Sequence, residues 1–435
     1  MKKYTNIGVI AILAVILLIG CCTPYTYQVT QKIYVPVYKS TEEFRNSVRQ
    51  QSPQPLKNPG KIYVYQNYLL INEVMEGVHI IDNSNPSAPN FVSFIAIPGN
   101  GDIAIKDNIL YADSYIDLLA IDISNPRSMK VVKRLDSLFP NPLDPNNYYM
   151  DRNKGVLVKW IIKDTVYNYS RSDCDGNTSP VSPGGAYYED GSTFRGMDLQ
   201  SGKSANTNST GGGNSNIGIG GSMARITIYD NYLYIVDQSN LQTLDISSPS
   251  NPRPWNKINI GWNIETIFPY GDKLFIGSMT GMFIYDNSTP WNPTRLCQFT
   301  HARSCDPVVA NDKYAYVTLR QGTRCGGGQN QLDILDITKI TNPVLLRSYP
   351  MQGPQGLGVD GTTLFICDGV AGLKVFNVED PKNIQLLDWE SDFKPYDVIP
   401  LGRVAILSTS DGIYQYDYIN PKDLKLLSKI SISKE

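Results

Sequence analysis

The sequence is short of the residues and motifs on which most recognisable protein chemistry depends. Its 435 residues include only two histidines, His79 and His301, so histidine-rich zinc sites and histidine-based acid–base catalysis are poorly supplied. It has no P-loop, no glycine fingerprint for dinucleotides and no calcium-binding loop. It has no basic run and a formal net charge of −2, so the phosphate-neutralising surface that nucleic-acid binding needs is missing. We therefore expect no metal ion, no cofactor and no nucleic-acid partner.

What the sequence does contain is a repeated turn motif. Residues 122–126 read Asp-Ile-Ser-Asn-Pro and follow an apolar run. Copies or looser variants begin at Asp82, Asp122, Asp245, Asp286, Asp336, Asn377 and Asp417, with separations of 40, 123, 41, 50, 41 and 40 residues. Asp, Asn and Ser side chains bond to nearby backbone and Pro cannot donate to a sheet, so each copy should end a strand. A period near 40 residues indicates a repeat architecture.

Each repeat has the pattern of four short strands. In the second repeat these are expected over 102–105, 109–112, 118–122 and 130–135. Four antiparallel strands per repeat are typical of a propeller blade. We predict an all-β fold over residues 61–432, an eight-bladed β-propeller of four-stranded antiparallel blades with one degenerate blade. Seven blades remain possible if residues 147–222 form only a decorated crossover.

The separation of 123 residues is explained by that degenerate repeat and an insertion. Residues 147–162 supply apolar, strand-like segments but lack the turn motif. Residues 170–222 are rich in Gly, Ser and Asn, from which no core can be built. We therefore predict an exposed or partly disordered insertion there.

The Leu-x-Ile-Asp-Ile-Ser-Asn-Pro pattern that ends at Pro126 resembles the bacterial LVIVD repeat, a propeller-forming family of exported proteins. The resemblance covers most of residues 61–432. It implies a fold and an exported protein, and it implies no common catalytic mechanism.

The N-terminus has the form of an export signal. A basic start is followed by an apolar core over residues 7–19, and residues 18–21 (Leu-Ile-Gly-Cys) resemble the lipobox of bacterial lipoproteins. On this interpretation residues 1–20 are the signal peptide and Cys21 is the acylated residue that holds the protein to a membrane. The alternative is a transmembrane anchor with an incidental cysteine, but the apolar core is short for a span.

The segment after Cys21 bears on location. Cys22 stands where an Asp would signal retention, so the sequence resembles an outer-membrane lipoprotein. We expect a lipid-anchored protein of the bacterial outer membrane, either facing the periplasm or displayed on the surface. Residues 21–60 should form a tether, with a strand over 31–38 and a short helix after the capping box at 40–43.

The remaining cysteines allow one disulfide to be suggested. Cys305 and Cys325 fall within one repeat of an exported chain, so they are the expected pair, although buried free thiols are the alternative. Cys367 lies in an apolar strand and should be a free core residue. The run from His301 to Asp306 places a His, a Cys and an Asp close together, but neighbours along a strand point to opposite faces, which argues against a nucleophilic site.

Alignment of the repeats places a polar residue near the start of most first strands, with Gln355-Gly356 at this place in the seventh repeat. Because first strands line the channel of a propeller, these side chains should converge at one mouth of it. They could form a charged ring that binds a cation or sugar hydroxyls, or each could accept backbone N–H bonds that fix its blade. Repetition by symmetry favours the structural role. The candidate ring consists of Lys61, Asp102, Arg225, Glu265, Asp306 and Asp397.

Two tryptophans, Trp262 and Trp291, lie at junctions between strands. They could stack on sugars or on a partner protein, but packing between blades is the expectation. The sequence thus favours a non-enzymatic, membrane-anchored binding or scaffolding module for a protein or glycan partner. The alternative function is an envelope enzyme that acts on polysaccharide through acidic residues at the channel mouth.

Overall fold

The computed structural model describes residues 24–144, 151, 153–172, 216–279, 281–300, 307–321 and 329–433. The chain divides into two compact units, Met1–Tyr38 with Leu157–Arg195, and Lys39–Val156 with Gly196–Glu435. The first unit contains a two-stranded ribbon of β1 (Pro24–Lys39) and β11 (Val156–Ser172). In the described part of the chain, no helix is long and apolar enough to cross a lipid bilayer.

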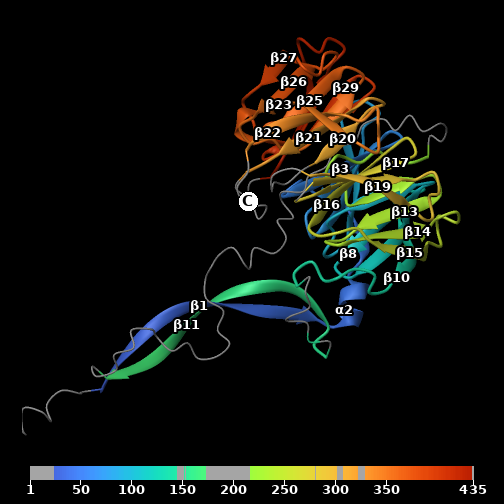
Figure 1. The fold of residues 1–435 in the computed structure, drawn as a ribbon. Helices are drawn as coiled ribbons and strands as arrows, with labels where there is room; N and C mark the ends of the chain where they lie inside the picture. Colours follow the sequence, from blue (N-terminus) through green and yellow to red (C-terminus); the bar gives the residue numbers. More distant parts are fainter. Residues whose placement is uncertain are drawn as a thin grey trace, which may run out of the picture. The chain divides into compact units, whose positions relative to one another are not determined.

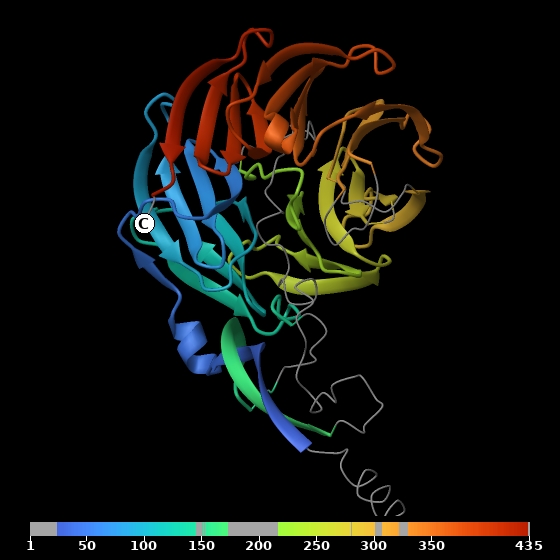
Figure 2. The same ribbon diagram turned by 90° about the vertical axis from the view of Figure 1, so that its left-hand side faces the viewer.

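The second unit is a β-propeller whose described strands form seven antiparallel sheets around a common axis (Figure 2). A fifth strand, β2 (Arg49–Gln51), extends the outer edge of blade 1. From the innermost strand outwards, blades 1 to 7 are β3 (Pro59–Tyr65), β4 (Tyr68–Glu73), β5 (Gly77–Asp82), β6 (Asn90–Ala96); β7 (Ile103–Lys106), β8 (Ile109–Ser114), β9 (Asp117–Asp122), β10 (Lys130–Leu135); β12 (Ile226–Tyr229), β13 (Tyr232–Val236), β14 (Asn240–Asp245), β15 (Arg253–Asn259); β16 (Ile264–Tyr270), β17 (Lys273–Ser278), β18 (Gly281–Asp286), β19 (Thr294–Thr300); β20 (Val308–Ala310), β21 (Tyr314–Leu319), β22 (Gln331–Asp336), β23 (Val344–Pro350); β24 (Leu357–Asp360), β25 (Thr363–Cys367), β26 (Leu373–Asn377), β27 (Gln385–Glu390); and β28 (Pro395–Leu401), β29 (Val404–Thr409), β30 (Gly412–Asp417), β31 (Lys425–Ser431).

The prediction of eight blades is wrong, and the seven-bladed alternative holds. The strand-like run expected to build a degenerate blade instead forms β11, a single strand of 17 residues. Its partner is β1, which precedes the propeller, so the described residues between β10 and β12 add no sheet to the ring. Local alternation identified a strand here, but the choice of partner depends on pairing far along the chain.

The turn motif folds as its residue types predict. In each copy the side chain of the first residue accepts a hydrogen bond from the backbone N–H two residues on, as from Ser124 to Asp122 at 2.9 Å. A hydroxyl at this second position adds a further bond, and this bond is the main cause of a lowered pKa at Asp82, Asp122, Asp245 and Asp336. Each copy therefore reverses the chain between the third and fourth strands.

The same motif also joins neighbouring blades. Its proline carbonyl accepts a hydroxyl from the preceding blade at Pro86, Pro126, Pro249, Pro290 and Pro381, with donors Ser428, Ser93, Tyr111, Tyr234 and Tyr349 at 2.6 to 3.0 Å. In blade 5 an isoleucine replaces the proline, and Cys297 Sγ donates to Ile340 O over 3.2 Å. The motif thus shapes a turn and supplies an acceptor for the adjacent blade.

Every outer strand carries one bulged residue at the same position in the repeat. The bulged residues are Val92, Val132, Trp255, Leu296, Leu346, Leu387 and Leu427. A bulge interrupts the hydrogen-bonding edge and increases local twist, which discourages pairing with strands of other chains. Blade 1 has additional cover, because β2 pairs with residues 94–96 of β6.

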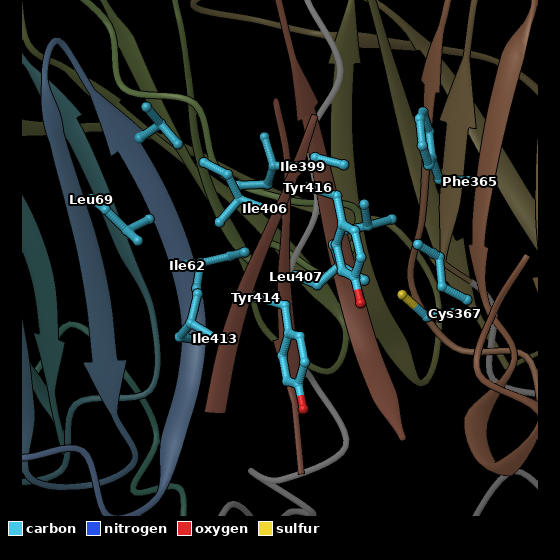
Figure 3. Close-up of a cluster of buried hydrophobic side chains, with 14 of the residues drawn as sticks. Ile62, Leu69, Phe365, Cys367, Ile399, Ile406, Leu407, Ile413, Tyr414 and Tyr416 are labelled. Atoms are coloured by element: carbon cyan, nitrogen blue, oxygen red, sulfur yellow. The ribbon is translucent and has the colours of Figure 1, made fainter. Parts of the chain in front are cut away.

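The ring closes between blade 7 and blade 1 without a shared blade. Apolar side chains of both blades meet those of blade 6 in one core cluster, which includes Ile62, Leu69, Ile406 and Phe365 (Figure 3). The amides of Asn83 and Gln415 bond to each other in both directions, at 2.9 and 2.8 Å. Ser433 N donates to Leu56 O over 2.6 Å next to the parallel bridge between Leu56 and Ile432.

We expect Gln415→Ala to lower the free energy of unfolding by about 2 kcal/mol, because the substitution leaves the Asn83 amide without its partner in a buried interface. Urea denaturation of the purified chain measures the change. Gln385→Ala is the matched control, since Gln385 is exposed on the outer strand of blade 6. Equal stability of the two variants would contradict a closing role for Gln415.

Candidate functional site

A segment of the chain occupies the propeller channel. We call residues 216–222 the axial segment. Val64 of β3 and Ile219 exchange backbone hydrogen bonds of 2.8 and 2.7 Å, and Gly218 N donates to Ile105 O of β7 over 2.7 Å. At its end, Leu357 N of β24 donates to Ser222 Oγ over 3.3 Å. The axial segment therefore contacts the inner strands of blades 1, 2 and 6.

This placement differs from the exposed insertion predicted for residues 170–222. Glycine explains the difference, because it permits a closer approach than any other residue. A Cβ built on Gly220 would lie 2.1 Å from a ring carbon of Tyr63, and one on Gly218 would lie 3.0 Å from Cβ of Ile105. A composition that cannot build its own core can thus fit into one built by other strands.

Asp102 is the most heavily bonded member of the candidate ring. It is 2% exposed, and its bonds join the inner strands of blades 1, 2 and 3. Its donors are Lys61 Nζ at 2.6 Å, Tyr63 OH at 2.6 Å, Ile103 N at 2.8 Å, Arg225 N at 2.6 Å and Ile226 N at 3.1 Å. Burial raises the pKa of the Tyr63 hydroxyl well above its usual range, so this hydroxyl stays a donor. Both carboxylate oxygens are therefore used inside the fold.

Asp397 is buried next to blade 6. Its Oδ1 accepts Val398 N over 2.9 Å and lies where a Cβ on Gly356 would stand, while its Oδ2 is buried without a hydrogen-bond partner. Burial raises the pKa of the Asp397 carboxyl well above its usual range, which favours the neutral form. A second buried carboxyl, Asp113, accepts Gly101 N over 2.7 Å, and burial raises its pKa to about 6.

The other candidates are placed as follows. Arg225 and Glu265 are half-buried at the starts of the inner strands of blades 3 and 4, and Arg225 Nε is buried without a partner. Asp306 lies outside the described residues, as do Cys21, the expected pair Cys305 and Cys325, and His301. Of the predicted ring, the structure brings Lys61 and Asp102 into contact.

Two described cysteines are free, Cys297 and Cys367. Burial raises the pKa of the Cys367 thiol well above its usual range, so this thiol is a core residue of low reactivity. Sequence reasoning missed a buried pair in blade 1, where His79 Nε2 lies 2.9 Å from Glu73 Oε2. Glu73 also accepts Lys57 N over 3.2 Å, which fixes the chain before β3. Within the described ranges, no three His, Cys, Asp or Glu side chains are grouped to hold a metal ion.

The tryptophans are not packed between blades as expected. Trp262 is 72% exposed and Trp291 is 45% exposed, and a third, Trp255, is 58% exposed. Trp291 lies in the turn of blade 4 with its ring 6.3 Å from that of Tyr232. These aromatic rings leave large apolar surface open to solvent.

Comparison with known proteins agrees with the fold. The family model described as "LVIVD repeat" matches residues 59–96, 100–137, 220–254 and 302–350, so the chain contains LVIVD repeats in blades 1, 2, 3 and 5. A solved protein from Lactobacillus plantarum has a TM-score of 0.54 at 11% identity, with 87% of this chain and 97% of that chain covered. The designed protein Ika8 has a TM-score of 0.49 at 9% identity, with 89% and 91% covered. BamB from Moraxella catarrhalis has a TM-score of 0.46 at 10% identity, with 84% of each chain covered. No curated protein sequence matches the chain significantly.

Proposed function

We propose that this β-propeller repeat protein is a lipoprotein of the bacterial outer membrane, anchored through Cys21, and that its propeller is a binding module for a glycan or protein partner. The observation that carries the proposal is the filled channel. The axial segment contacts three inner strands, and Asp102 is used in bonds between blades. Partners are therefore left with the outer surface of the blades and their turns, where large aromatic side chains are exposed.

The same observation weighs against a polysaccharide-cleaving enzyme with its acidic pair at the channel mouth. Such an enzyme needs two carboxyl groups that both reach the sugar. Asp102 is 2% exposed and Asp397 is 0% exposed, and Asp102 already bonds to Lys61. A binding role requires no such pair, so it is the function we favour.

The anchor is tested by Cys21→Ser. We expect the variant to accumulate as an unprocessed precursor, because lipid transfer to the cysteine sulfur precedes removal of residues 1–20 on the lipoprotein interpretation of this signal. Mass spectrometry and fractionation of membranes from the producing bacterium measure the outcome. Cys22→Ser is the matched control and should mature as the unmodified chain does. Normal maturation of Cys21→Ser would refute the anchor and leave the binding role to be judged separately.

A further inference from the structure

Two positions of the repeat change to tryptophan where blade 3 meets blade 4. The bulged residue stands ten places after the start of the turn motif (255 − 245 = 10), and it is Val or Leu in the six other blades. The residue after the proline position stands five places after that start (291 − 286 = 5). In the other blades it is Ser87, Arg127, Ser250, Thr341, Lys382 and Lys422. Because the scaffold does not need tryptophan at either position elsewhere, both substitutions call for another explanation.

The fold brings these two departures together. The outer strand of each blade lies against the turn motif of the next blade, as the bonds to the proline carbonyls show. At this junction Asn256 Nδ2 donates to Asn292 Oδ1 over 2.9 Å, so the residue after Trp255 is bonded to the residue after Trp291. We call Tyr232, Trp255, Asn256, Trp291 and Asn292 the tryptophan patch.

The patch combines exposed rings with neutral amides. Trp255 and Trp291 are 58% and 45% exposed, and the Tyr232 ring supports Trp291 from 6.3 Å. The bond between the two asparagines uses one N–H and one oxygen lone pair, so further donors and acceptors of both amides are available. Pro254 and Pro290 restrict the backbone next to each tryptophan, which reduces the entropy lost when a ligand binds.

We propose that the tryptophan patch binds a polysaccharide built of pyranose rings, an inference that rests on the proposed binding function and names its ligand class. Aromatic faces fit the apolar C–H faces of sugars, and amide side chains fit the hydroxyl groups at the ring edges. A protein partner is the less fitting occupant, because protein hot spots gather in well-packed pockets, whereas these rings stand on the convex outer surface of the blades. Neutral amides between the rings also supply no charge with which to select a charged protein surface.

The test is electrophoresis of the full chain in mild detergent through native gels that contain hydroxyethylcellulose, xylan, laminarin or pullulan. We expect at least one polysaccharide to retard the unmodified chain. Trp255→Ala and Trp291→Ala should each weaken that binding about tenfold, which corresponds to about 1.4 kcal/mol. Circular dichroism and thermal melting should stay unchanged, because both side chains are exposed.

Trp262→Ala is the matched control. Trp262 precedes β16, whereas Trp291 follows β18, a strand that runs in the same direction, so the two tryptophans lie at opposite ends of blade 4. Trp262→Ala should therefore bind as the unmodified chain does. Retardation that survives both patch substitutions would overturn the patch as the site but leave the proposed binding function standing. Absence of retardation with every polysaccharide, or a discrete protein adduct when a photo-crosslinking residue replaces Trp255, would overturn the ligand class.

Discussion

Asp102→Ala is expected to lower the free energy of unfolding by about 3 to 5 kcal/mol, the range measured when one partner of a buried ion pair is removed. The substitution leaves the Lys61 ammonium buried 5% exposed without its carboxylate 2.6 Å away. It also removes the acceptor of two backbone N–H groups at the start of β12, those of Arg225 and Ile226. Denaturation in urea, followed by circular dichroism, measures the loss.

Two controls separate this structural role from ligand binding. Lys61→Met combined with Asp102→Leu should recover much of the stability, because an apolar pair replaces a buried ionic pair without leaving a lone charge. Asp397→Asn should change stability little, since burial already raises the pKa of that carboxyl and favours its neutral form. If Asp102→Ala keeps normal stability but loses binding in the polysaccharide gels, the ring is a ligand site and the structural assignment is wrong.

The sequence predicted the blades because their signals are local. Asx turns, prolines and alternating apolar residues act over a few positions, so the four-stranded repeat and its period could be inferred from the chain alone. The number of blades could not, because β11 has the alternation of a blade strand and its partner β1 lies more than a hundred residues earlier. Strand pairing at such a distance is decided by the assembled fold.

The candidate site was predicted in part for the same reason. Alignment of first strands correctly placed Lys61 and Asp102 at one end of neighbouring inner strands, where they meet. It could not reveal that the axial segment fills the channel, because a Gly-rich stretch has the same composition whether it is exposed or tightly packed. The tryptophan patch could have been found from sequence by comparing the position ten residues after each turn motif, where Trp255 alone is aromatic.

Gly220→Val is expected to destabilise the propeller by about 3 kcal/mol or more, at or beyond the upper end of the usual cost of overpacking. Its added carbons would overlap the Tyr63 ring, since a Cβ alone would stand 2.1 Å from that ring. Tyr63 cannot move aside freely, because its hydroxyl donates to Asp102 over 2.6 Å. The strain would therefore reach the bonds that join blades 1, 2 and 3.

Gly353→Ala is the matched control, because nothing lies within 4 Å of a Cβ at that position. This substitution should leave the urea midpoint nearly unchanged, whereas Gly220→Val should shift it strongly. The comparison also bears on where a ligand can bind. If Gly220→Val is as stable as the unmodified chain, the axial segment does not pack in the channel, and Lys61, Asp102 and Asp397 become accessible again as a binding ring. If the loss is large, the channel is part of the core, and recognition must take place on the outer surface that carries Trp255 and Trp291.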